Sequence, residues 1–318
     1  MEVLSNLAAS SVLIVANWAR NRPAPGVSRG AAPAAGYNSP MTSALFSGVV
    51  FGVAALAGFL GALTGLGGGV VVTPVLTSFL GVDIRFAIGA SLVSVIATSS
   101  GAAAAYVREG FSNIRAGMFL EIATTLGAVA GAHLTTVLPG SALAIIFGAV
   151  LLYSAWHSFR VRRETPAEVS DPLAIRLRLQ SSYPGREGIV HYNVARVRGG
   201  FSLMFVAGVL SGLLGIGSGA MKVIAMDQVM RFPFKVSTTT SNFMIGVTAA
   251  ASAGIYLSRG YIDPGVAMPV MLGVLTGSFL GARQLVVSRT PLLRMVFALV
   301  VGVLAFEMLY SGFTGRFR

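Results

Sequence analysis

A few polar side chains interrupt long apolar stretches of this sequence, and an anion is the ligand they fit best. Lys222 is the only lysine within an apolar segment, and it follows a glycine cluster that ends at Gly219. An ammonium group inside a bilayer is costly and normally faces a cavity or a charged partner. A structural pair with Asp227 or with a backbone carbonyl is the alternative, but an anionic ligand explains the position of Lys222 better.

Two glycine clusters, at residues 65–69 and 215–219, interrupt apolar runs. Glycine costs about 1 kcal/mol relative to alanine in a helix interior, so each cluster favours a helix break. A new half-helix is expected near Val70 and near Ala220, where free N–H groups and the positive dipole end attract anions. Close helix packing is the alternative. The cluster residues predicted to bind substrate are Gly67, Gly68, Gly69, Gly217, Ser218 and Gly219.

The apolar segment after each glycine cluster carries hydroxyl and amide side chains that can donate to the oxygens of an anion. The same hydroxyls can instead bond to carbonyls of their own helix, which is the alternative for any single one of them. Ser241 and Asn242, as adjacent residues, favour a functional role together. The predicted ligands in these segments are Ser91, Thr98, Thr240, Ser241, Asn242 and Thr248.

Carboxylates are rare in the apolar segments. Glu121 lies well inside the third segment, where it is a candidate for H+ coupling or a partner for Arg115. Glu307 lies near the end of the last segment and is expected at the membrane interface. The chain has no cysteine and three scattered histidines, so the sequence predicts no metal site, no cofactor and no enzyme activity.

These residues must be positioned by membrane helices. The chain is 54% hydrophobic and 11% charged, whereas soluble domains carry about 25% charged residues. Runs of about 20 apolar residues match the hydrocarbon thickness. We therefore expect an all-α, polytopic transmembrane helical bundle in the lipid bilayer, with apolar segments at 43–80, 86–107, 114–138, 142–158, 199–226, 236–257, 265–287 and 291–311.

An internal repeat organises these segments. A shift of 150 residues aligns the second half with the first without a gap, pairing Gly58 with Gly208 and Tyr106 with Tyr256. Internal duplication is common in transporters, whose substrate site lies between the repeats. We expect two tandem four-span repeats with glycine-broken helices, in the same orientation. The predicted regions are an N-terminal extension with a Pro/Gly/Ala-rich linker (1–40), a first repeat (41–158), a basic loop (159–198) and a second repeat (199–318).

The arginine distribution predicts the topology. The net charge is +12, and the 159–198 loop is rich in arginine. The positive-inside rule accounts for this pattern without nucleic acid as a partner, and it places the loop and both termini in the cytoplasm. We expect a multi-pass protein of the bacterial inner membrane.

The glycine clusters and the stretch Lys235-Val-Ser-Thr-Thr-Thr-Ser-Asn-Phe-Met-Ile-Gly-Val-Thr-Ala-Ala250 resemble the TauE/SafE (TSUP) family of sulfite and sulfonate exporters. The resemblance covers roughly residues 45–312. It implies secondary transport of small sulfur oxyanions or organosulfonates, with export favoured. Ile224 and Ser218 depart from the family pattern of proline and glycine. A passive anion channel is an alternative function, since the same helix ends would serve it. A membrane scaffold or assembly protein is a second alternative.

Overall fold

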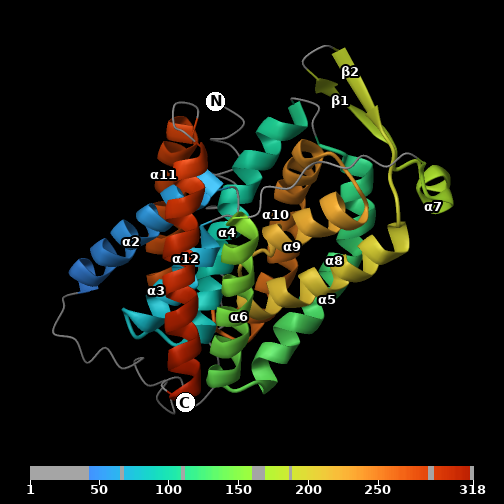
Figure 1. The fold of residues 1–318 in the computed structure, drawn as a ribbon. Helices are drawn as coiled ribbons and strands as arrows, with labels where there is room; N and C mark the ends of the chain where they lie inside the picture. The colour runs from blue at the N-terminus through green and yellow to red at the C-terminus, as the bar shows by residue number, and fades with distance from the viewer. Residues whose placement is uncertain are drawn as a thin grey trace, which may run out of the picture.

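The computed structural model describes residues 43–64, 68–108, 112–159, 169–185, 188–285 and 290–315. These residues are mostly helical (Figure 1), and the predicted N-terminal extension lies outside them. The elements are α2 (Ser43–Thr64), α3 (Gly69–Ser78), α4 (Ile84–Arg108), α5 (Ile114–Val137), α6 (Gly140–Phe159), α7 (Pro172–Arg176), β1 (Ser181–Gly185), β2 (Gly188–Tyr192), α8 (Val197–Leu214), α9 (Gly219–Ile224), the π-helical η1 (Ala225–Val229), α10 (Phe234–Ser258), α11 (Pro264–Leu285) and α12 (Thr290–Phe313).

The two glycine clusters break helices as predicted. After α2 and α8, new helices begin at Gly69 and Gly219, one residue before the expected starts. In the second break, Gly215 and Gly217 both have φ of +68°, and Ser218 has φ of +43°. Left-handed backbone suits glycine because it has no Cβ, and it ends a regular helix. Gly65 to Gly67 lie outside the described residues.

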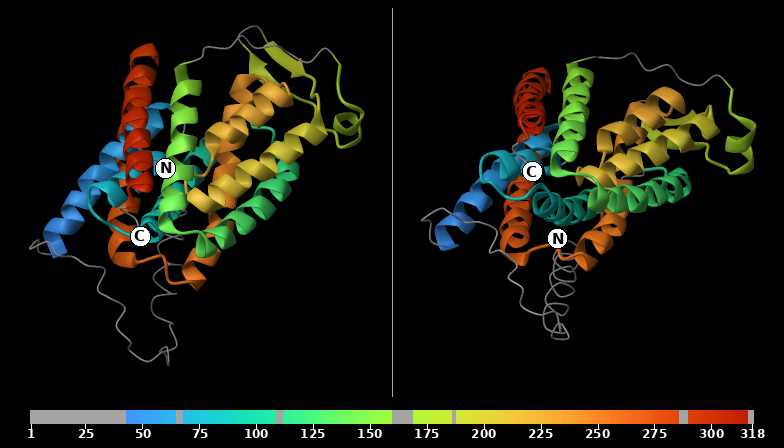
Figure 2. Two further views of the ribbon diagram at one scale, coloured as in Figure 1. Left: turned by 60° about the horizontal axis from the view of Figure 1, so that its bottom comes forward. Right: turned by 90° about the horizontal axis from the view of Figure 1, so that it is seen from below.

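The offset of 150 residues recurs in the packing. α4 spans 84–108 and α10 spans 234–258, so their bounds differ by 150 at both ends. α2 packs on α11 and α8 packs on α5, on opposite sides of the bundle (Figure 2). A Cβ added to Gly58 would overlap the Val274 carbonyl, and one added to Gly208 would overlap the Thr124 carbonyl. Both members of this contact pair are 150 residues apart.

Helices α6 and α12 pack together and run in opposite directions. The C-terminal end of α6 lies at the end of the bundle that carries the β1–β2 hairpin, whereas the C-terminal end of α12 lies at the other end (Figures 1 and 2). With both helices across a bilayer, the hairpin and the C-terminus fall on opposite faces. This arrangement differs from the sequence-based expectation that the 159–198 loop and both termini share the cytoplasmic side, and from the expected equal orientation of the halves.

Large apolar side chains cover the outside of the bundle. On α5, Met118, Ile122 and Leu126 are exposed at a spacing of four residues, and on α12 Val303 and Phe306 are exposed. Such stripes would be unstable in water, and they suit contact with lipid tails. Among the described residues, two helices are long and apolar enough to cross a membrane on those criteria alone, α5 and α8. The eight predicted apolar segments are all helical, but their number of crossings stays a prediction.

Part of the basic loop is folded, which the sequence did not predict. Short helix α7 and the antiparallel β1–β2 hairpin pack at the start of α5. Asn113 caps α5 by accepting from the Ala116 N–H, and its side-chain amide donates to the Leu179 carbonyl and the Tyr192 hydroxyl, both at 2.8 Å. Burial raises the pKa of Tyr192 to about 12, so its hydroxyl stays protonated at neutral pH.

Asn113→Ala is expected to loosen the attachment of the hairpin to the bundle. It removes a helix cap, worth about 1 kcal/mol, and leaves the Leu179 carbonyl without its side-chain donor. We expect faster protease cleavage within residues 169–192 and a lower melting temperature. Ser202→Ala, which alters an exposed hydroxyl bonded to its own helix, is the control. Unchanged cleavage in Asn113→Ala would contradict this role.

Candidate functional site

Lys222 is completely buried on α9, and its ammonium group is held by a side chain from another helix. Nζ donates to the Thr248 hydroxyl of α10 at 2.6 Å. A cation in such a place is stable only with negative charge nearby, because the desolvation cost is several kcal/mol. The protein supplies that charge from a third helix.

Glu121 of α5 supplies the negative charge. The Thr248 hydroxyl contacts Glu121 Oε1 at 2.6 Å, and the Thr125 hydroxyl donates to the same oxygen at 3.1 Å. Glu121 is 8% exposed, and its second oxygen, Oε2, has no hydrogen-bond partner within the described part of the chain. We call Lys222, Thr248 and Glu121 the buried charge chain. It joins α9, α10 and α5, elements far apart in the sequence.

The buried charge chain changes the pairings expected from the sequence. Arg115, the expected alternative partner of Glu121, donates instead to the Arg178 carbonyl in the folded loop. Lys222 was expected to await an anion, or to pair with Asp227 or a carbonyl. Its printed partner is Thr248, and through it the charge of Glu121. The sequence placed all three members of the chain among candidate residues but did not connect them.

The second group of predicted residues meets where the two glycine breaks cross. Ser91 donates to the carbonyls of Gly69 and Gly215, at 3.2 and 2.9 Å. Ser241, 150 residues after Ser91, donates to the Gly219 carbonyl at 3.3 Å. These serines therefore tie α4 and α10 to the starts of the half-helices, and their hydroxyl protons are already engaged.

The tight packing at this crossing explains the glycines. A Cβ on Gly217 would lie 2.8 Å from Ile245 and 3.1 Å from Val95, two residues that are also 150 apart. A Cβ on Gly69 would lie 2.6 Å from the Ser91 hydroxyl. No larger residue fits, so the breaks of both halves meet at one point between α4 and α10.

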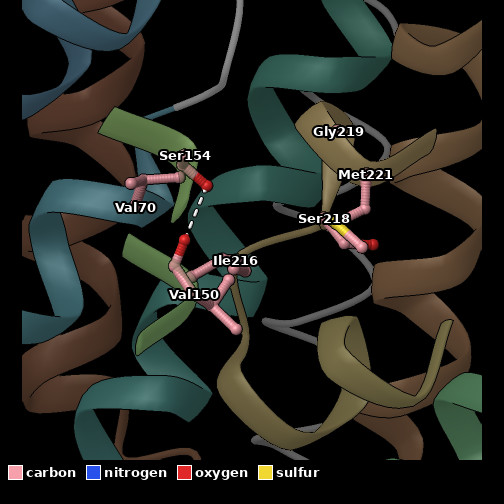
Figure 3. A pocket seen from close by; sticks show the side chains of 7 residues that line it. All are labelled: Val70, Val150, Ser154, Ile216, Ser218, Gly219 and Met221. Atoms are coloured by element: carbon pink, nitrogen blue, oxygen red, sulfur yellow. Dashed lines mark hydrogen bonds between the residues drawn. The ribbon is translucent and has the colours of Figure 1, made fainter. Parts of the chain in front are cut away.

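A small pocket lies beside the starts of α3 and α9, where the helix dipoles are positive (Figure 3). Its volume is about 10 Å³, enough for one water molecule at most. The Ser154 hydroxyl, on α6, donates to the Val150 carbonyl at 2.8 Å. The lining residues are Val70, Val150, Ser154, Ile216, Ser218, Gly219 and Met221. Ser218 and Gly219 are the predicted site residues among them.

The remaining predicted ligands have other positions or partners. Thr98 donates to carbonyls of its own helix, at Ser94 and Val95. Thr240 accepts from the Asn113 N–H at 3.0 Å, so it holds the start of α5. Asn242 is half-buried and belongs to neither group of contacts, and Gly67 lies outside the described residues. The Ser218 hydroxyl is bonded to the Ala207 carbonyl at 2.6 Å.

Sequence reasoning missed one polar cluster. Glu307, expected at the interface, accepts hydrogen bonds from Ser78 at the end of α3 and from Ser311 of α12. Its position in an apolar helix was a signal, because a carboxylate there needs donors. The sequence does not show which donors, since Ser78 lies 229 residues away.

Helices broken by glycine, a buried charge chain between them and an apolar exterior define a polytopic helical membrane protein of the transporter type. The comparisons with known proteins agree. The chain belongs to the sulfite exporter TauE/SafE family, whose model matches residues 50–308. It is thus a membrane-embedded member of a transporter family.

Several curated relatives carry transporter names. The chain is 26% identical over 271 residues to the probable membrane transporter protein YunE of Bacillus subtilis, covering 83% of this chain and 97% of the relative. A probable membrane transporter protein of Xylella fastidiosa is 26% identical over 266 residues, covering 82% and 94%. The probable membrane transporter protein YdhB of Bacillus subtilis is 27% identical over 240 residues, covering 74% and 87%. No solved structure matches the chain.

Proposed function

We propose that this protein is a secondary transporter of small sulfur-containing anions, such as sulfite or organosulfonates, with export as the favoured direction. The observation that carries the proposal is the complete burial of Lys222 on a helix that starts at a glycine break. A buried ammonium near positive helix ends is unfavourable unless negative charge is present, and a substrate anion supplies such charge. The family description supports a sulfur oxyanion as the substrate class.

We infer that the two halves form inverted repeats around this site in the bacterial inner membrane. The offset of 150 relates α4 to α10 and α6 to α12, and the antiparallel run of α6 and α12 fits an axis in the membrane plane (Figure 1). The breaks would then meet near the bilayer centre. Since the pocket there holds one water at most, anion entry requires that α3, α6 and α9 move apart.

Loss of the Lys222 charge is expected to abolish anion binding. Lys222→Met alone would leave Glu121 without its counter-charge, so the informative variant combines Lys222→Met with Glu121→Gln and keeps the site neutral. Removing a charge-assisted hydrogen bond costs about 1.5–3 kcal/mol, which is roughly 10- to 150-fold in affinity. Binding of sulfite and methanesulfonate is measured by calorimetry on purified protein, and flux in proteoliposomes.

Lys235→Met makes the same chemical change at an exposed lysine and is expected to bind like the wild type. Wild-type affinity in the folded double variant would refute Lys222 as the anion ligand. The flux experiment also separates the alternatives. Accumulation of the anion against its own gradient indicates a transporter, flux only down that gradient indicates a passive channel, and no flux indicates a scaffold.

A further inference from the structure

We propose that Glu121 is an exchangeable counter-ion of the anion site: it neutralises Lys222 when the site is empty, and it takes up one proton when a monovalent anion replaces it. The inference rests on the proposed function and deepens it, since it names H+ as the coupling ion and fixes the ratio. Its basis is the buried charge chain, in which a carboxylate, a hydroxyl and an ammonium from three elements meet.

The charges around this chain are few. Lys222 is the one charged group that acts on Glu121, and Glu121 the one that acts on Lys222, within the described part of the protein. α10 contributes Thr248, and α8 presents Phe205 and Gly208 to the neighbouring part of α5. No third charge is therefore at hand to balance an incoming anion. A net charge in this apolar surrounding would cost several kcal/mol.

Charge balance then dictates the proton. The empty site holds one positive and one negative charge, which sum to zero. A bound monovalent anion would bring the sum to minus one, unless Glu121 is protonated. The proton has a place to bind, because Glu121 Oε2 is buried and has no hydrogen-bond partner. One proton from water thus enters with each anion and leaves with it.

Thr248 allows Lys222 and Glu121 to separate. Its single hydroxyl proton can point to Glu121 Oε1 at 2.6 Å or to the Met244 carbonyl of its own helix at 2.9 Å. When the anion draws the ammonium away, Thr248 can turn to Met244 and stay satisfied. A direct ion pair would offer no such alternative, so the threonine makes the exchange less costly.

The charge chain exists once in the molecule, which limits the ratio to one proton. The residues 150 positions away from Lys222 and Glu121 are Val72 and Met271, both uncharged. Thr98 is the counterpart of Thr248, and it bonds to its own helix. The two halves therefore differ in the residues that carry charge.

The test counts protons on anion binding. Calorimetric titrations of the purified full chain with methanesulfonate, in buffers of different ionisation enthalpy, give the protons taken up per anion. Methanesulfonate keeps one negative charge throughout, so the proton belongs to the protein. We expect about one proton for the wild type, and an affinity that falls about tenfold per pH unit where Glu121 is ionised in the empty site. Glu121→Gln is expected to take up none and to bind independently of pH.

The wild-type count stands alone if Glu121→Gln fails to fold. With sulfite, which carries its own titrating proton, the difference between wild type and Glu121→Gln gives the contribution of the protein. Binding without proton uptake would overturn this inference and leave the proposed function intact. Binding of neither sulfite nor methanesulfonate would overturn both. A proton uptake that persists in Glu121→Gln would assign the proton to another group and also overturn the inference.

Discussion

Lys222→Met is expected to lower the free energy of unfolding by about 3–5 kcal/mol, and adding Glu121→Gln is expected to restore most of the loss. Removal of one partner from a buried ion pair leaves the other charge uncompensated in an apolar surrounding. Glu121 would be that charge, since Lys222 is the charged group acting on it. With both residues neutral, methionine fills the space of the lysine stem and glutamine keeps its contact with Thr125.

A double-mutant cycle measures this coupling, with unfolding followed by denaturant or heat in detergent micelles. Glu121→Gln alone should also destabilise, because it leaves Lys222 buried without a counter-charge. Lys235→Met is the control and should stay within about 0.5 kcal/mol of the wild type, as surface changes usually do. Additive effects of the two single changes would show that the pair does not interact and would remove the basis of the proton inference.

The sequence identified the members of the charge chain for different reasons and could not join them. Lys222 and Glu121 stood out because charge is costly in apolar helices, and Thr248 because of its offset from Thr98. Whether they meet depends on the rotation of α5, α9 and α10 about their axes. The periodicity of these helices does not reveal this, since they are apolar on most faces. For the same reason, Thr240 and Ser241 seemed equivalent, although one holds Asn113 and the other the Gly219 carbonyl.

Helix positions were easier to predict than orientation. Apolar length and glycine clusters placed α3 and α9 within one residue, because both signals are local. The β1–β2 hairpin was missed, since its exposed strands carry little apolar alternation. The direction of α6 against α12 depends on whether each broken helix crosses fully or turns back. Arginine counts were dominated by one loop and did not decide that question.

Gly212→Ala is expected to prevent α5 and α8 from packing and to cost at least about 3 kcal/mol, the upper part of the usual range for overpacking. A Cβ at this position would overlap the carbonyl oxygen of Ala128, which is backbone and cannot turn away. One turn earlier on α8, a Cβ at Gly208 would overlap the Thr124 carbonyl in the same way. The helices must therefore separate along this seam.

The measurement is the yield of monodisperse protein and its melting temperature, with Gly254→Ala as the matched control. Gly254 lies inside α10 with open space where its Cβ would be, so alanine there should be neutral or stabilising by helix propensity. Gly208→Ala should behave like Gly212→Ala. If Gly212→Ala melts like the wild type, α5 and α8 do not pack through their glycines. α5 carries Glu121, and α8 leads through the glycine break to Lys222. Separation of these helices should therefore also disturb the buried charge chain, and anion binding should decline together with stability.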